Sequence, residues 1–175
     1  MPGESDSFPE EMPAARPLDP ESLGDHLDRL FRAAWALCGS RADAEDLVQE
    51  TYVRVLARPR VIRREDDLAY LMRALRNTFL AGRRRSSVRE PPLPLDEGLD
   101  RAPASASPAP DELVEQRRVY EAIAALPDEF RDALVAVDVA GLSYREAARA
   151  LRVPEGTVTS RLSRAREQVA RTLGR

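Results

Sequence analysis

Residues 141–166 read GLSYREAARALRVPEGTVTSRLSRAR, and this stretch contains the start and stop signals of two short helices. Ser143 and Glu146 form a capping box, in which the hydroxyl and the carboxylate satisfy each other's free backbone N–H groups at a helix start. The helix that follows is expected to end near Leu151. Residues 152–156 (RVPEG) predict a tight turn, because proline and glycine both interrupt regular structure.

The second helix of this stretch is expected to begin at Thr157, its predicted N-cap, and it is amphipathic. Its apolar residues recur at three- and four-residue steps, as on one face of a helix. They are Val158, Leu162, Ala165, Val169 and Leu173. Two short helices around a Pro/Gly turn, the second with polar and basic side chains on its open faces, suit a helix-turn-helix whose second helix enters a DNA major groove.

The remainder of the chain is also predicted to be helical, because it lacks sustained alternation of apolar and polar residues. Helices are expected over Leu113–Leu126 and Pro127–Ala140, with Gly141 as the terminator. Three more are expected earlier, from Asp19 to Gly39, from Ser40 to Pro59, and from Asp66 or Asp67 onward, sharing one small core. The inward residues would be Leu23, Leu27, Leu30, Phe31, Ala34 and Leu37, then Leu47, Val48, Thr51, Val55 and Leu56, then Leu68, Leu71, Met72, Leu75 and Phe79.

Charge and composition divide the chain into four segments. The net charge of −3 conceals two basic segments, since residues 23–90 carry 14 Arg and 10 acids and residues 113–175 carry 11 Arg and 9 acids. Between them lies a stretch too rich in Pro, Ala and Ser to hold a helix. We therefore expect an all-α protein with two small helical domains that move semi-independently. The predicted segments are a disordered acidic tail (1–18), a first domain (19–89), a flexible linker (90–110) and a second domain (111–175).

Composition excludes several classes of function. The 175 residues include one Cys, Cys38, and one His, His26, which rules out an internal disulfide, a cysteine-rich or histidine-based metal site and a Ser-His-Asp triad. We expect no metal, no cofactor and no catalytic residues. No apolar run approaches the roughly 20 residues that cross a bilayer, and the N-terminus is acidic, unlike a signal peptide. The sequence therefore predicts a cytoplasmic protein without membrane insertion.

Two sets of motifs resemble a known family. Residues 43–52 (DAEDLVQETY) and 70–79 (YLMRALRNTF), followed by an Arg run, closely resemble region 2 of the extracytoplasmic function (ECF) sigma factors of bacterial RNA polymerase. Residues 125–127 (ALP), 141–148 (GLSYREAA) and 153–166 (VPEGTVTSRLSRAR) resemble region 4 of the same family. The two resemblances occur in the expected order and cover roughly three quarters of the chain.

This resemblance implies a non-enzymatic initiation factor that gives promoter specificity to core RNA polymerase. Region 4 would read the minus-thirty-five element as duplex, and region 2 would capture the minus-ten element as the strands part. The implied partners are promoter DNA, the coiled coil of the polymerase's largest subunit, the flap of its beta subunit and an anti-sigma factor.

The resemblance also implies site residues. For minus-thirty-five DNA they are Thr159, Ser160, Arg161, Ser163, Arg164 and Arg166. For minus-ten DNA they are Arg63, Arg64, Arg73, Arg76, Asn77 and Arg84. For core polymerase they are Asp46, Gln49 and Glu50.

Other classes of protein remain as alternatives. The final helix-turn-helix also resembles that of response regulators, so a conventional DNA-binding regulator is the main one. Such a protein would normally add a dimerisation or ligand-sensing domain, whereas the first half here is a compact basic unit. A protein-binding adaptor fits poorly with two basic domains. An enzyme is least favoured, because the chain has no phosphate loop, metal cluster or nucleophile-base set.

Overall fold

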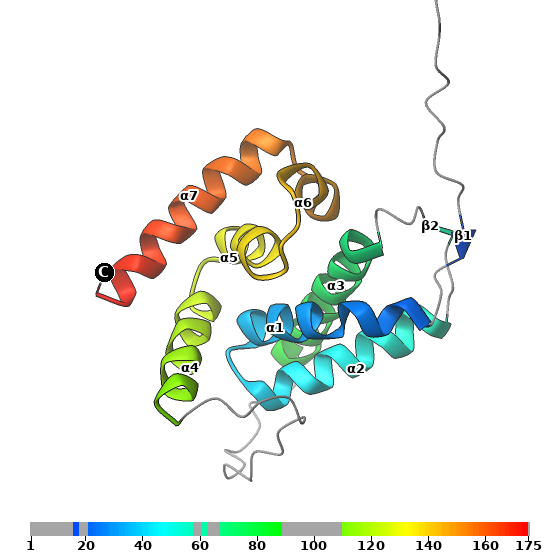
Figure 1. Ribbon diagram of the computed structural model, residues 1–175, viewed down its shortest axis with the longest axis horizontal. Helices are drawn as coiled ribbons and strands as arrows, with labels where there is room; N and C mark the ends of the chain where they lie inside the picture. The colour runs from blue at the N-terminus through cyan, green and yellow to red at the C-terminus, as the bar shows by residue number, and fades with distance from the viewer. Residues whose placement is uncertain (1–15, 18–20, 58–60, 63–66, 89–109, 175) are drawn as a thin grey trace, which may run out of the picture.

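The computed structural model describes residues 16–17, 21–57, 61–62, 67–88 and 110–174, and it is helical apart from one pair of very short strands (Figure 1). In chain order the elements are β1 (Arg16–Pro17), the 3-10 helix η1 (Glu21–His26), α1 (Leu27–Cys38), α2 (Arg41–Ala57), β2 (Val61–Ile62), α3 (Asp67–Val88), α4 (Pro110–Ala124), α5 (Asp128–Leu134), the π-helical turn η3 (Val135–Val139), α6 (Tyr144–Leu151) and α7 (Glu155–Thr172). The all-α class is confirmed.

Helices α2 and α3 form where the sequence predicts them, and α1 ends where predicted but begins at Leu27, after the 3-10 helix η1, rather than near Asp19. Gly39 ends α1 in a left-handed conformation (φ 75°), and its N–H donates to the carbonyl oxygen of Trp35 at 2.7 Å. The hydroxyl of Ser40 accepts from the N–H of Asp43 at 3.4 Å, as a cap at the start of α2. Helix α3 begins at Asp67. Local signals therefore determine where these helices start and stop.

The second half differs from the prediction at three points. Helix α4 covers Pro110–Ala124 instead of Leu113–Leu126, so it begins at the last residue of the predicted linker. The helix expected over residues 127–140 changes from α to π geometry at Val135, so α5 continues as η3 up to the turn at Gly141 (φ 73°). The last helix begins at Glu155 rather than after Thr157, because Pro154, extended at φ −61° and ψ 151°, already serves as the N-cap residue. Proline has no backbone N–H to donate, and its ring clashes with a preceding helical turn. The helix therefore cannot extend N-terminal to this position.

Three assignments of the sequence analysis are wrong. Leu27 and Leu56 were expected to point inward, but they are 45% and 47% exposed. Each lies at the edge of its stripe near a helix end, where no neighbouring helix covers it. Arg16 and Pro17 fall within the predicted disordered tail, yet they form β1, antiparallel to β2. Residues before proline favour extended backbone, which suits a short edge strand.

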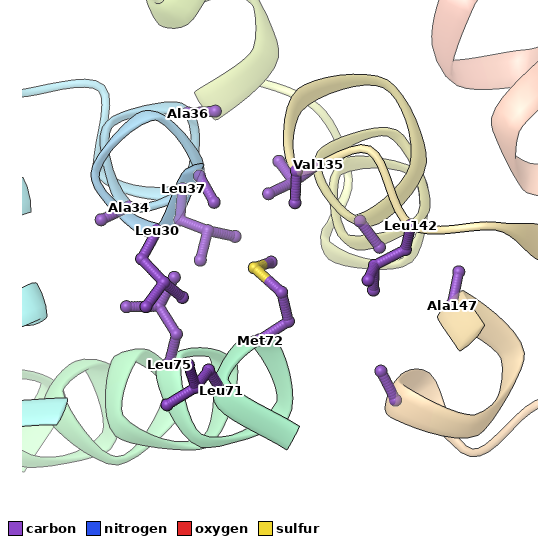
Figure 2. Packing of buried hydrophobic residues seen from close by; sticks show 14 of the residues in the cluster. Leu30, Ala34, Ala36, Leu37, Leu71, Met72, Leu75, Val135, Leu142 and Ala147 are labelled. Carbon is purple, nitrogen blue, oxygen red and sulfur yellow. The ribbon is translucent and has the colours of Figure 1, made fainter. Parts of the chain in front are cut away.

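The two halves of the molecule share one hydrophobic core. Leu37 on α1 and Met72 on α3 belong to the same buried cluster as Val135 and Leu142 from the second half, and Figure 2 shows these side chains converging between the helices. This differs from the expectation of two separately packed domains that move semi-independently. The cause is that α1 and α3 each have a second apolar face: α4 and η3 pack on α1, and α6 packs on α3.

Some predictions fall outside the described residues. These are the tail up to residue 15, the Arg63 and Arg64 loop, and the linker over residues 90–109. Among the residues that the structure does describe, no helix is long and apolar enough to cross a bilayer.

Candidate nucleic-acid interface

Helices α6 and α7 form the predicted helix-turn-helix. The Ser143 hydroxyl accepts from the backbone N–H of Glu146 at 3.2 Å, and the Glu146 carboxylate accepts from the Ser143 backbone N–H at 2.8 Å. The capping box is therefore confirmed. The Ser143 hydroxyl also donates to the Glu146 carboxylate at 2.6 Å. This bond, helped by the one from the Ser143 backbone N–H, holds the pKa of Glu146 below its usual range, because both favour the carboxylate over the acid. The helix ends at Arg152, whose left-handed conformation (φ 58°) turns the chain toward α7.

Helix α7 presents a polar face to solvent. Val158, Leu162 and Ala165 are buried beneath it, and they fix the rotation of the helix about its axis. Figure 1 shows α7 on the side of the molecule away from α2. Five of the predicted minus-thirty-five residues are exposed on it, namely Thr159, Ser160, Ser163, Arg164 and Arg166.

Two hydroxyls on this face are oriented by their own helix. Thr159 Oγ1 donates to the Glu155 carbonyl at 3.0 Å, and Ser160 Oγ donates to the Thr157 carbonyl at 3.1 Å. A hydroxyl has one proton and two lone pairs, so each of these groups remains an acceptor toward solvent. In a major groove, acceptors match the amino groups of adenine and cytosine. Arg164 supplies the complementary donor on the same face.

The other two arginines predicted on this helix bind acids of their own half. Arg161 pairs with Glu129 at 2.9 Å, and its side chain is largely covered. Arg166 makes two hydrogen bonds to Asp138, at 2.8 and 2.7 Å, which raise its pKa further above the usual arginine value. Contact with DNA phosphate would have to compete with these ion pairs. Their role as phosphate ligands stays a prediction.

The polar side of α3 is split between solvent and the second half of the molecule. Asn77 and Arg84 are exposed. The Arg73 guanidinium lies 5.8 Å from the centroid of the Tyr70 ring, a cation–π distance. Arg76 Nε donates to Asp132 Oδ2 of α5 at 2.5 Å. The four residues therefore lie on one side of α3, but Arg76 faces α5 rather than solvent.

The acidic face of α2 remains open. Asp46 and Gln49 are exposed, whereas Glu50 accepts hydrogen bonds from Arg54 at 2.6 Å and from Arg85 of α3 at 3.0 Å. The bond from Arg85, helped by Arg54, lowers the pKa of Glu50. Glu50 thus links α2 to α3, while Asp46 and Gln49 are available to another molecule.

Sequence reasoning missed Val53 on this same face of α2 and assigned Leu56 to the core instead. Val53 is 62% exposed, and it lies with Leu56 on the helical stripe that contains Asp46 and Gln49. Their spacing of three, four and three residues could have revealed this stripe. A mixed polar and apolar surface of this kind is typical of protein–protein contacts.

The structure gives no support to metal or thiol chemistry. In the described part of the chain, no three His, Cys, Asp or Glu side chains are grouped to hold a metal ion. Burial raises the pKa of the Cys38 thiol to about 12, so this group stays protonated and unreactive near neutral pH.

The fold and its exposed faces define a two-part helical protein whose C-terminal helix-turn-helix suits duplex DNA. Comparison with known families agrees with this class. Residues 23–89 match the model of sigma-70 region 2, and residues 116–169 match that of sigma-70 region 4.

Individual relatives and one solved structure extend the match. SigE of Mycolicibacterium smegmatis, an ECF RNA polymerase sigma factor, is 40% identical over 161 residues, which are 89% of this chain and 62% of that protein. SigM of Mycobacterium tuberculosis, another ECF sigma factor, is 33% identical over 150 residues, 85% of this chain and 74% of that one. The sigma factor RpoE of Bartonella quintana, solved with the anti-sigma factor NepR, superposes with a TM-score of 0.65 at 25% identity, covering 88% of this chain and 95% of that one.

These matches establish the family. The chain belongs to the sigma-70 family and, within it, to the ECF RNA polymerase sigma factors.

Proposed function

We propose that this protein binds core RNA polymerase and directs transcription initiation at a specific set of promoters. One observation carries the proposal. A single chain of this family has both an exposed helix-turn-helix face on α7 and an exposed acidic face on α2. The first suits duplex DNA and the second suits a protein partner. In the proposal the protein has no catalytic activity, works in the cytoplasm, and lends specificity to the catalytic polymerase.

Duplex reading is assigned to α7. Thr159, Ser160 and Ser163 would accept from base amino groups, and Arg164 would donate to guanine or phosphate. Short hydroxyl side chains discriminate less strongly than a bidentate arginine, so DNA shape would contribute to specificity. Arg161 and Arg166 would contact phosphate only after leaving Glu129 and Asp138.

Strand capture is assigned to α3 and the loop before it. Arg73, Arg76, Asn77 and Arg84 share one side of α3, and Arg63 and Arg64 precede it in the chain. Opened DNA exposes base faces and pairing edges that a duplex hides, so this surface acts only once the strands part.

Polymerase binding is assigned to α2 and to the second domain. Asp46 and Gln49 would contact the coiled coil of the largest subunit, with Glu50 holding α2 against α3. The second domain would contact the beta-subunit flap. The domain limits 19–89 and 111–175, with a tail and an interdomain linker outside them, belong to the same proposal. An anti-sigma factor is a further expected partner, since RpoE of Bartonella quintana binds one.

Run-off transcription tests this function directly. Purified protein is mixed with core RNA polymerase and genomic fragments, and the transcripts are mapped. We expect initiation at defined starts that requires both the protein and core polymerase. Tight binding of the protein alone, as a dimer, to a palindromic site would instead identify a conventional transcriptional regulator.

A further inference from the structure

The connection between α2 and α3 contains a short strand contact. Its residues Val61 and Ile62 form β2, which pairs antiparallel with β1 in the register Arg16 to Ile62 and Pro17 to Val61. Figure 1 shows β1 and β2 side by side near the end of α2, away from α4. Two segments that α1 and α2 separate in the chain are thus joined through their backbones.

The backbone of Arg16 is essential to this strand pair. In an antiparallel ladder, residue pairs that exchange two hydrogen bonds alternate with pairs that exchange none. Pro17 has no N–H, so Arg16 is the residue of β1 that can both donate to β2 and accept from it. The pair therefore depends on one backbone N–H of β1 and not on the side chain at that position.

A second contact attaches the same part of the chain to α2. The Tyr52 hydroxyl donates to the backbone carbonyl oxygen of Leu23 in η1 at 3.0 Å. Leu23 is only 6% exposed and belongs to the hydrophobic core. We call β1 and η1 together the N-terminal arm. The core and Tyr52 hold this arm at η1, and β2 holds it at β1.

Strand β2 lies in the middle of a connection whose two ends are also fixed. Helix α2 ends at Ala57, and α3 begins at Asp67, which is only 4% exposed. The pairing with β1 is therefore a third point of attachment between these helices. A loop that is already held in place loses less conformational entropy when a ligand binds, so its affinity for that ligand is higher.

The match to the family does not include β1. The region 2 match begins at residue 23, whereas β1 covers residues 16 and 17. The connection itself falls inside the match, and Arg63 and Arg64 directly follow β2 in the sequence. The strand β1 is thus an addition of this chain, attached to a segment that the family shares.

From these contacts we propose that the N-terminal arm is a positioning element for strand capture, in which β1 holds the α2–α3 connection ready for opened DNA. The pairing with β2 lowers the ordering cost that the connection, with Arg63 and Arg64, meets when a single strand binds. The inference rests on the proposed function, which assigns strand capture to α3 and the loop before it. Duplex reading by α7 and polymerase binding by α2 do not depend on the arm.

Two substitutions at one position separate the backbone of β1 from its side chain. Arg16→Pro removes the N–H that pairs with β2, and the chain can still be extended there. Arg16→Ala removes the same charge and keeps the N–H, so it is the matched control. Hydrogen exchange of the Ile62 amide in the full chain reports on the pair. We expect faster exchange in Arg16→Pro only, and an amide already unprotected in the parent would overturn the proposal.

Run-off transcription with core polymerase then measures the function of the arm. The template is a promoter identified with the genomic fragments, used as a duplex and as a bubble whose strands are already parted around minus ten. Loss of one hydrogen bond changes an equilibrium by about fivefold, so Arg16→Pro should initiate about fivefold less on the duplex. On the bubble it should match the parent, because capture no longer has to drive melting. Arg16→Ala should match the parent on both templates.

Two deletions repeat the comparison without any substitution. Removal of residues 1–17 deletes β1, whereas removal of residues 1–15 deletes the four acids of the preceding segment and keeps β1. The longer deletion should behave like Arg16→Pro, and the shorter one like the parent. Equal defects in both deletions would assign the effect to the acidic segment and would overturn the role of the strand pair.

The results separate this inference from the proposed function. If the parent and core polymerase give no promoter-specific initiation, the proposed function is wrong, and the inference fails with it. If the parent initiates specifically but Arg16→Pro equals Arg16→Ala on the duplex template, the arm alone loses its role. A defect in Arg16→Pro that the bubble does not relieve would also overturn the inference, since the arm would then act on folding or on polymerase binding.

Discussion

Trp35 of α1 and Tyr120 of α4 lie with their ring centroids 4.6 Å apart and their planes tilted by 31°. Both rings are buried, and burial raises the pKa of the Tyr120 phenol. The pair joins a helix from the region 2 match to one from the region 4 match. It therefore makes the stability of each half depend on the other.

Removing the Tyr120 ring tests this dependence. We expect Tyr120→Ala to lower the free energy of unfolding by about 3–5 kcal/mol, because a buried aromatic is replaced by a cavity. Tyr120→Phe, which keeps the ring, should cost no more than about 1.5 kcal/mol. Urea unfolding followed by circular dichroism measures both. Similar losses in the two variants would mean that the ring contact is not what couples the halves.

The capping box of α6 predicts a pH dependence of stability. The pKa of Glu146 is lower in the folded protein than in the unfolded chain, mainly through the Ser143 hydroxyl. Its contribution is therefore complete above the unfolded pKa of about 4.3, and it is lost as the pH falls through the lower folded value. Ser143→Ala should lower the free energy of unfolding by about 1 kcal/mol at neutral pH. It should also reduce the acid limb, that is, the loss of stability as the pH falls below the unfolded pKa of Glu146.

Urea unfolding at several pH values between neutrality and about pH 3 checks this prediction. Ser160→Ala is the matched control, since it removes a hydroxyl that is exposed on α7 and bonds only within its own helix. It should leave the acid limb unchanged. An acid limb equally steep in the parent and in Ser143→Ala would contradict a role for this cap.

Substitutions on α7 and α3 should impair different steps of initiation. Arg164→Ala is expected to weaken minus-thirty-five binding by roughly 1–3 kcal/mol if it contacts a base, or to reduce the salt dependence if it contacts phosphate. Asn77→Ala should leave duplex binding unchanged and impair melting. A pre-melted bubble template should therefore rescue Asn77→Ala but not Arg164→Ala in run-off transcription.

Arg171→Ala serves as the control on α7, because Arg171 lies near the C-terminal end of the helix and pairs with Glu167, one turn earlier. It should behave like the parent in both assays. Equal rescue of the Asn77 and Arg164 variants by the bubble would contradict the division of tasks between α3 and α7.

The acidic face of α2 predicts a loss of polymerase affinity without loss of fold. Asp46→Arg should reduce binding to core polymerase at least tenfold, since it reverses an exposed charge at the proposed contact and a tenfold change needs only about 1.4 kcal/mol. Asp28→Arg makes the same charge change on the exposed side of α1 and should bind normally. Affinity is measured by fluorescence anisotropy of labelled protein. Reduced helicity in Asp46→Arg would show that this acid is structural.

Much of the secondary structure could be predicted from short-range patterns alone. The helix stop at Gly39 and the capping box at Ser143 depend on a few neighbouring residues, so the chain specifies them locally. The face of α7 is likewise determined by the spacing of Val158, Leu162 and Ala165. Because these features arise within single helices or between adjacent ones, the family and its candidate DNA-reading residues were accessible from the sequence.

Only the tertiary structure decided how the two halves meet. Periodicity indicates that Arg76 and Asp132 each lie on a particular side of their helix, but they are 56 residues apart and nothing local pairs them. Nor could a pattern show that Leu27 and Leu56 stay exposed, since burial depends on which helix packs against an apolar stripe. The shared core and the Arg76–Asp132 pair both result from long-range packing, in which shape and charge must match across separate helices.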